Sequence, residues 1–424
     1  MTTLAKNSGI WQWALFSFVL AGLTGFVFRM GFVFPLPEFL NLENIRHAHS
    51  HLMFFGWASL LPLYFIKLDI ISGYHAALGA RLMKNSLWWI LIFGILSFPV
   101  FLLFGYQSVS ISSTSLPLAV IFSGMVMLGW YGFMAGYVIT KFKKKNFQAN
   151  IFYEAALVML FICSLGAWSV GGTQIFEIGG PLLPKALTHF FLANFVEGWV
   201  ILVLMGFISK ALAMKEDDFV VSPTALVALI AVGAPFTFPY GFSEGLINFD
   251  LSVAARTGGI LIAEGVLLFA YSIIRTHRNH ISLWIWPIIF LVLKSLMQIT
   301  ASVTPMGMWL ADHGVRILYL HTTLLGALST GIIWFLYQMV SMKRIYFYAV
   351  LISIAMLIGS LVLPTSILPV TLFGAWVYKI LAIVAIFPVI AVLFFWLKLG
   401  TIVEQEHHPK HPKDIPSIRR EAVL

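Results

Sequence analysis

Long apolar stretches dominate the hydropathy pattern of the chain and alternate with short polar gaps. Each stretch approaches or exceeds about 20 residues, the length that an α-helix needs to cross the hydrocarbon layer of a membrane. Twelve such stretches occur, so we expect twelve transmembrane helices. They cover roughly residues 11–33, 48–68, 86–104, 115–139, 152–172, 187–210, 223–243, 253–275, 282–302, 315–340, 344–364 and 371–398.

The composition agrees with an integral membrane protein. Of the 424 residues, 60% are hydrophobic and only 10% are charged, whereas about 25% of the residues in a soluble domain are charged. This excludes a soluble enzyme, a disordered chain and a nucleic-acid binder with a basic face. The single cysteine excludes a disulfide framework and an iron–sulfur cluster. Any metal chemistry would therefore rest on the 12 histidines.

The basic residues indicate the orientation of the helices. Lys143 and Lys144 follow the fourth predicted span, Arg344 follows the tenth, and the loops after the second and eighth spans are also basic. Short cytoplasmic loops carry an excess of Lys and Arg, so the even-numbered spans should end inside the cell. We therefore predict an all-α transmembrane domain over residues 1–400 with both termini cytoplasmic. A disordered cytoplasmic tail, residues 401–424, is expected to follow.

Histidines recur near the outer ends of the second, sixth and tenth predicted spans. His49, His189 and His321 are separated by 140 and 132 residues, a recurrence of about four helices. This spacing predicts three pseudo-repeated blocks of four helices. A single intramembrane histidine could simply hydrogen-bond a neighbouring helix. Three at matching depth indicate a functional site, because ionisable groups are costly in the membrane and imidazole is a common ligand of haem iron.

Four arginines lie near the outer ends of the first, second, eighth and tenth predicted spans, where the topology rule expects few cations. They are Arg29, Arg46, Arg256 and Arg316. One explanation is an anionic ligand such as the propionates of a haem, because a guanidinium group matches a carboxylate bidentately. The alternative is ion pairing with outer acidic residues such as Glu43.

Two short stretches carry a family resemblance. The run Arg46-His47-Ala48-His49 with Phe55-Gly56, and the run from His321 to Gly326, occupy the second and tenth predicted spans. They resemble stretches of the catalytic subunit of the haem-copper oxidase superfamily, especially its C-family branch, and the chain is also similar to the NnrS family linked to nitric-oxide stress. The resemblance implies that His49 and His321 hold one low-spin haem b. It also implies that His189 corresponds to the first copper ligand of the family.

The sequence departs from the family at its second metal centre. Tyr319 stands where the family has the proximal histidine of its high-spin haem, and residues 234–241 lack the adjacent histidine pair that binds copper. One remaining imidazole does not make a copper site. The resemblance therefore implies a single haem site, without the binuclear centre that reduces oxygen to water.

The space of the lost centre has two interpretations. His189, Glu197 and Tyr319, with Tyr240 and Glu244 nearby, could form a second centre that holds a non-haem iron, or a haem on Tyr319. Alternatively, these residues are hydrogen-bonding core residues that fill the space.

Three further residues are candidates by their position along the helices. His51 follows His49 by two residues, which turns its side chain about 200° away. Both cannot face one haem. The resemblance implies that His49 is the haem ligand, so we assign His51 to a place beside the haem or at a second metal. Glu264 and Lys294 both fall near the membrane centre. We predict that they form an ion pair, with a proton path as the functional alternative.

Three functions follow from these features. The first is a b-type haem protein of the inner (plasma) membrane, with its haem near the outer face. It would transfer electrons from a cytochrome, a quinol or a partner subunit in respiratory or nitric-oxide-related metabolism. The second is a gas-reducing oxidoreductase with a catalytic centre at His189, Glu197 and Tyr319. The third is a metal or solute permease without haem. None of the three involves nucleic acid.

Overall fold

The structure is a computed structural model, and the residues that it describes form an almost entirely helical membrane protein. These are residues 9–407 except 72–76, 112–113, 145–149, 177, 179, 181, 243–248, 278–283, 305–311, 341, 370 and 372. Within them, ten helices are long and apolar enough to cross a membrane, and two shorter apolar helices accompany them. This confirms the coarser prediction, an all-α fold with apolar helices long enough for a lipid bilayer.

In the described part of the chain, nine helices contain no π-helical segment, and one short hairpin joins two of them. They are α1 (Ile10–Met30), α4 (Leu78–Phe104), α5 (Leu118–Lys143), α6 (Ile151–Phe176), α9 (Pro223–Phe236), α10 (Phe249–His277), α11 (Ile285–Val303), α15 (Arg344–Ser360) and α16 (Ala375–His407). The antiparallel hairpin β1 (Val109–Ile111) and β2 (Thr114–Leu116) connects α4 to α5. Two 3-10 turns, η3 (Glu216–Asp218) and η4 (Phe238–Gly241), flank α9.

Some boundaries differ from the sequence-based expectation. Helix α4 begins at Leu78 and not near residue 86. Helix α16 continues to His407, so residues 401–407 are helical and do not belong to a disordered tail. The rest of the predicted tail lies outside the described residues.

Three long spans each change from α-helix to π-helix and back. The second span is α2 (Leu42–Leu52), η1 (Met53–Ser59) and α3 (Leu60–Ile70). The sixth is α7 (Leu182–Ala193), η2 (Asn194–Val200) and α8 (Ile201–Ala211), and the tenth is α13 (His313–His321), η7 (Thr322–Ser329) and α14 (Thr330–Gln338). They are the most deeply buried spans, and they are the three that the histidine spacing singles out.

The three π-helical segments are joined to one another by indole hydrogen bonds. Trp57 Nε1 in η1 donates to Ser329 Oγ in η7 over 2.8 Å. Trp199 Nε1 in η2 donates to the carbonyl oxygen of Ala58 in η1 over 2.9 Å. In a π-helical turn the backbone pairing shifts from i→i+4 to i→i+5. Such turns are often found at functional sites. These bonds hold the histidine-bearing halves of the three helices in fixed relative positions.

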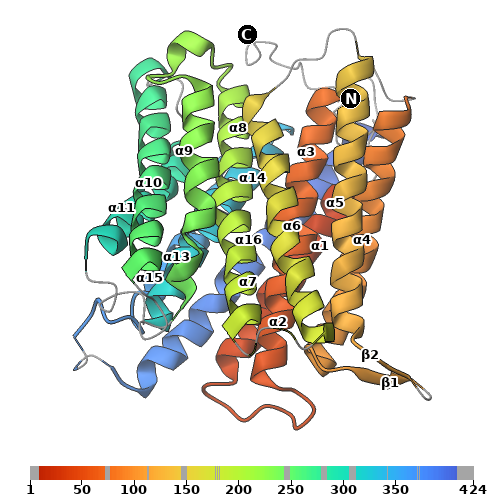
Figure 1. Ribbon diagram of the computed structural model, residues 1–424, viewed down its shortest axis with the longest axis vertical. Coiled ribbons are helices and arrows are strands. Elements are labelled where there is room, and N and C mark those ends of the chain that lie inside the picture. The colour runs from red at the N-terminus through yellow and green to blue at the C-terminus, as the bar shows by residue number, and fades with distance from the viewer. Residues whose placement is uncertain are drawn as a thin grey trace.

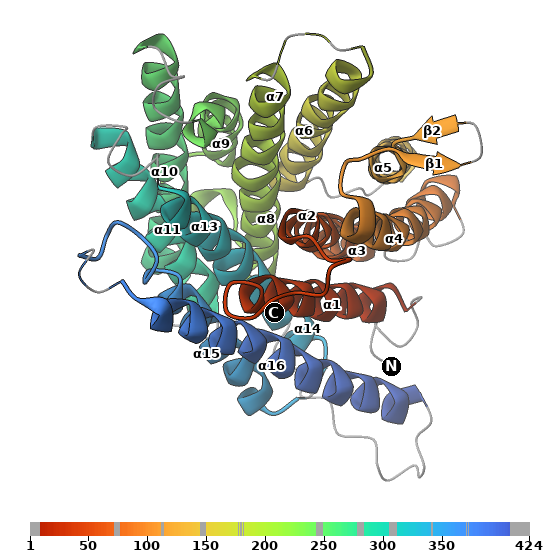
Figure 2. The ribbon, with the colours of Figure 1, turned by 90° about the horizontal axis from the view of Figure 1, so that it is seen from below.

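The remaining helices surround these three (Figures 1 and 2). Helix α1 packs between α16 and the second span, α4 packs along α5, and α10 packs between α9 and α11. Figure 1 shows the start of α2 and the β1–β2 hairpin at the same, lower end of the molecule. In the view from that end, α2, α8 and α13 approach the middle (Figure 2). The candidate residues on α2 and α13 therefore lie inside the bundle, near one end of it.

Candidate functional site

His49 and His321 are both held by hydrogen bonds from the same ring nitrogen. His49 Nδ1 lies 2.7 Å from the carbonyl oxygen of Ala21 in α1, and His321 Nδ1 lies 2.8 Å from that of Ile317 in its own helix. A carbonyl oxygen can only accept a hydrogen bond, so Nδ1 carries the proton in both rings. Each Nε2 then keeps its lone pair, which is the state in which imidazole binds a metal.

The two imidazoles lie at similar places in their spans. His49 precedes η1 by four residues and His321 directly precedes η7, and the Trp57–Ser329 hydrogen bond joins these two segments. His49 also packs against Gly25 of α1, where a Cβ atom would stand 2.9 Å from the ring. Glycine at this position therefore allows the imidazole to lie against α1. Both histidine side chains are half-buried, which leaves part of each ring accessible.

Two of the four predicted arginines have an unused donor. Arg316 Nη1 donates to the carbonyl oxygen of Gly241 over 2.7 Å. Arg316 Nε and Arg256 Nε are buried and have no hydrogen-bond partner among the described residues. A buried donor without a partner carries a free-energy cost, and an anionic ligand would remove it. Arg46 differs, because it pairs with Glu43 at 3.3 Å and is 48% exposed. The ion-pair alternative therefore accounts for Arg46, which does not belong to this group.

His51 faces away from His49, as the helical rotation predicts. Its Nε2 lies 2.8 Å from the hydroxyl oxygen of Tyr106, and its ring stacks on Phe101 with centroids 3.9 Å apart. Tyr106 belongs to the segment after α4, so His51 fastens α2 to its neighbour on the far side from His321. No contact of His51 with His49 or His321 occurs in the described structure.

The proposed partner of Lys294 was wrong. Lys294 Nζ forms a buried ion pair with Glu197 of η2, and it also donates to Gln298 Oε1 over 2.6 Å. Glu264 is exposed on α10 and makes no ion pair with the residues that the structure describes. The reason is rotational: Lys294 and Glu264 share a depth in the membrane, but Glu264 faces outward from its helix while Lys294 faces the bundle interior.

Glu197 and Tyr319 are brought together, but His189 makes its contacts elsewhere. The Tyr319 hydroxyl donates to Glu197 Oε1, while Lys294 takes Oε2, so both carboxylate oxygens are engaged. His189 lies against Gly241 and packs edge-on to Phe242, with ring centroids 5.7 Å apart. A side chain at position 241 would overlap the imidazole. His189 is thus adjacent to the carbonyl that Arg316 binds.

Tyr240 extends this polar region toward α11. Its hydroxyl lies 2.8 Å from Ser302 Oγ. Glu244, the other residue expected nearby, lies outside the described residues. Among the described residues, no group of three or more His, Cys, Asp or Glu side chains is arranged to hold a metal ion.

The comparisons with known proteins do not assign this chain to a family. Neither a scan against protein-family models nor a search of curated proteins gives a match for this chain.

Asp312 fixes the start of the helix that carries Arg316 and His321. Its Oδ1 accepts hydrogen bonds from the backbone N–H groups of Gly314 at 2.7 Å and Val315 at 3.3 Å, and its Oδ2 accepts one from Ser366 at 2.5 Å. Burial alone would raise the pKa of Asp312, but these N–H groups favour the carboxylate and hold its pKa below the usual value. Asp312 thereby ties α13 to the segment after α15.

Replacing Asp312 with alanine should lower the stability of the protein by about 1–2 kcal/mol at neutral pH, the usual cost of losing a helix cap. Because the pKa is lower in the folded than in the unfolded protein, the contribution is present above the unfolded value, about 3.9. It is lost as the pH falls through the folded value. Thermal unfolding in detergent at several pH values from neutral to acidic would measure this. Asp217→Ala, at an exposed site on η3, is the control. The assignment fails if Asp312→Ala and the parent protein lose stability in parallel on acidification.

Proposed function

We propose that this protein is a membrane-embedded b-type haem protein in which His49 and His321 are the two axial ligands of one iron. The observation that carries the proposal is the matched state of the two imidazoles. Each Nδ1 is bound to a backbone carbonyl, and each Nε2 has no hydrogen bond in the described structure. They come from two helices that π-helical segments join at the centre of the bundle.

Buried guanidinium groups fit the acidic edge of a haem. Arg256 and Arg316 each have a buried Nε without a partner among the described residues. These groups would bind the haem propionates, because guanidinium groups form strong hydrogen bonds to carboxylates. Gly25 would keep the space for the imidazole of His49 against α1.

We assign electron transfer as the activity. A haem with two imidazole ligands supplies a one-electron iron couple and leaves no coordination position for a gas. The engaged oxygens of Glu197 support a structural role for Glu197, Tyr319 and Lys294, so we favour electron transfer over gas reduction. The electron donor would be a cytochrome, a quinol or a partner subunit. The link to respiratory or nitric-oxide metabolism rests on the family resemblance.

The arrangement in the membrane follows the same proposal. Twelve spans in three four-helix blocks would place both termini in the cytoplasm and the histidine-bearing ends toward the outer face of the inner membrane. The π-helical segments of the second, sixth and tenth spans support such a repeat, because one local feature recurs at the predicted interval.

Visible spectra of the purified protein test the proposal. The oxidised and dithionite-reduced protein should show the bands of a low-spin haem, and adding carbon monoxide to the reduced protein should leave these bands unchanged. A large shift with carbon monoxide would instead favour a gas-reducing enzyme. A colourless preparation from cells supplied with haem would contradict the proposal and favour a permease.

A further inference from the structure

Helix α10 presents a seven-residue repeat to the outside of the bundle. Exposed polar side chains recur along one stripe of the helix, and an aliphatic side chain follows each of them three residues later. Residues at this spacing lie along one face of a helix. The polar positions are Asp250, Thr257, Glu264 and Tyr271, and the aliphatic positions are Val253, Ile260, Leu267 and Ile274. We call these eight residues the α10 stripe.

The α10 stripe is accessible over its whole length. Val253 is 45% exposed and Ile260 is 38% exposed in its outer half, and Tyr271 and Ile274 are 56% and 47% exposed near the other end. Leu267 is half-buried. The stripe therefore runs across the depth of the membrane as one continuous surface.

Glu264 makes this surface unsuited to lipid alone. It stands midway along α10, about 22 Å from Phe249 at 1.5 Å per residue, and its side chain is exposed. Among the described residues, the other acidic and amine side chains at this depth, Glu197 and Lys294, are buried and paired. A carboxyl group facing acyl chains is costly, and such groups normally face a partner that satisfies them. Glu264 therefore has no partner for its carboxyl group among the described residues.

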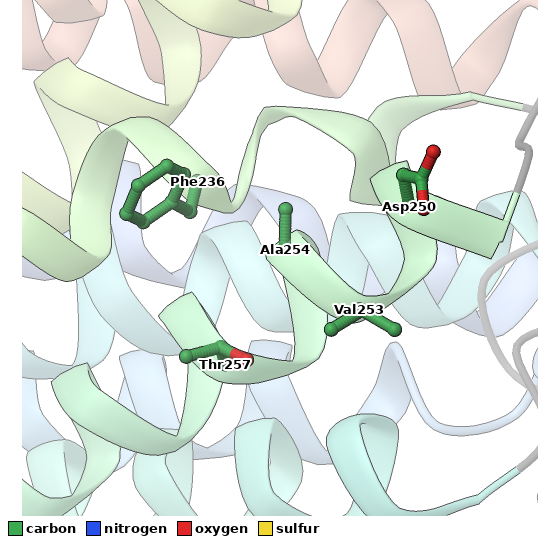
Figure 3. Close-up of a pocket in the computed structure, with 5 residues that line it drawn as sticks. All are labelled: Phe236, Asp250, Val253, Ala254 and Thr257. Carbon is green, nitrogen blue, oxygen red and sulfur yellow. The ribbon is translucent and has the colours of Figure 1, made fainter.

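The outer end of the α10 stripe is hollowed. A depression of about 320 Å³ lies between the ends of α9 and α10 and is lined by Phe236, Asp250, Val253, Ala254 and Thr257. Figure 3 shows four of these residues on α10 and Phe236 on the helix beside it. Val253 belongs both to this hollow and to the aliphatic row. A helix lying along the stripe would thus have a recess for side chains at its outer end.

We propose that the α10 stripe binds a transmembrane helix of another chain that carries a lysine or arginine at the depth of Glu264. Charge complementarity selects this occupant over a second copy of the protein. Two copies in one membrane share their orientation, so a two-fold pair along this stripe would set each polar residue against its own counterpart. Glu264 would then face Glu264 and Asp250 would face Asp250, whereas a helix with a basic residue at the depth of Glu264 gives that carboxylate an opposite charge.

A synthetic helix tests this surface directly. The probe is a fluorescent leucine–alanine transmembrane peptide with one central lysine, added to the full-length labelled protein in nanodiscs. The comparison peptide has leucine in place of the lysine. Energy transfer should show that the lysine peptide binds about tenfold more tightly than the leucine peptide, since a polar contact between membrane helices contributes about 1–2 kcal/mol and 1.4 kcal/mol is tenfold.

Variants of Glu264 assign the contact. Glu264→Leu should abolish the preference for lysine, and Glu264→Lys should reverse it toward a peptide with a central glutamate. The proposal is overturned if both peptides bind the parent protein equally, or if Glu264→Leu keeps the preference. It is also overturned if the parent protein alone self-associates in vesicles and Glu264→Leu abolishes that association, because the partner is then a second copy.

Discussion

His49→Ala and His321→Ala should each abolish the low-spin haem spectrum of the purified protein. Each substitution removes one of the two imidazoles that we assign to the iron, and a single imidazole leaves the iron five-coordinate or unbound. Any haem retained by these variants should be high-spin and should bind carbon monoxide, unlike the parent. Spectra at equal protein concentration, with haem quantified per polypeptide, measure the effect.

His51→Ala is the matched control, because His51 lies on the same helix but contacts Tyr106 and Phe101. It should keep the low-spin spectrum and the haem content of the parent. Imidazole added to His49→Ala should restore low-spin bands in part, since the free ligand can occupy the vacated position. A His51→Ala protein without haem, beside a His49→Ala protein with unchanged spectra, would contradict the assignment.

Lys294→Met should destabilise the protein by about 3–5 kcal/mol. This is the range observed when one partner of a buried ion pair is removed and the other charge stays buried. Lys294 is fully buried, and its partner Glu197 has a side-chain exposure of only 5%. Denaturation in mixed micelles, followed by circular dichroism, would measure the change in the free energy of unfolding.

The double variant Lys294→Met with Glu197→Gln should recover most of this loss, because no uncompensated charge remains and the amide can still accept the Tyr319 hydroxyl. Glu264→Gln is the comparison at equal depth, and it should leave the stability of the isolated protein nearly unchanged. A loss below about 1 kcal/mol in Lys294→Met, the size typical of an exposed ion pair, would show that this pair is not a fixed part of the core.

Periodicity along the chain predicted much of the fold. Long apolar runs are enough to locate membrane helices, because the hydrocarbon thickness sets their length. The interval between His49, His189 and His321 identified the three spans that the structure places innermost. The rotation of 100° per residue also separated His51 from His49 correctly, because direction along a regular helix follows from residue number.

Rotation between helices could not be predicted in the same way. Glu264 and Lys294 share a depth, and depth was the only coordinate that their positions supplied. Glu197 stands in the middle of its own span as well, so the same argument would have offered it as a partner for Lys294. Which of the two acids faces Lys294 depends on how three helices are turned toward one another, and that is a property of their packing.

Local departures from the α-helix also escaped prediction. Residues 53–59, 194–200 and 322–329 contain mostly apolar and small side chains, apart from Asn194 and Glu197, and nothing that they share in composition separates a π-helix from an α-helix. The repeated Gly56-Trp57 and Gly198-Trp199 pairs were the available signal, since both lie within π-helical segments and both tryptophans donate across the centre. Their hydrogen bonds could be recognised only once the helices were seen side by side.

The central claim is that one iron is bound by His49 and His321, and low-temperature electron paramagnetic resonance of the oxidised protein tests it most directly. Protein with ¹⁵N-labelled histidine should give a single low-spin ferric signal with hyperfine coupling to two imidazole nitrogens. A high-spin ferric signal, or coupling to only one imidazole nitrogen, would contradict the claim.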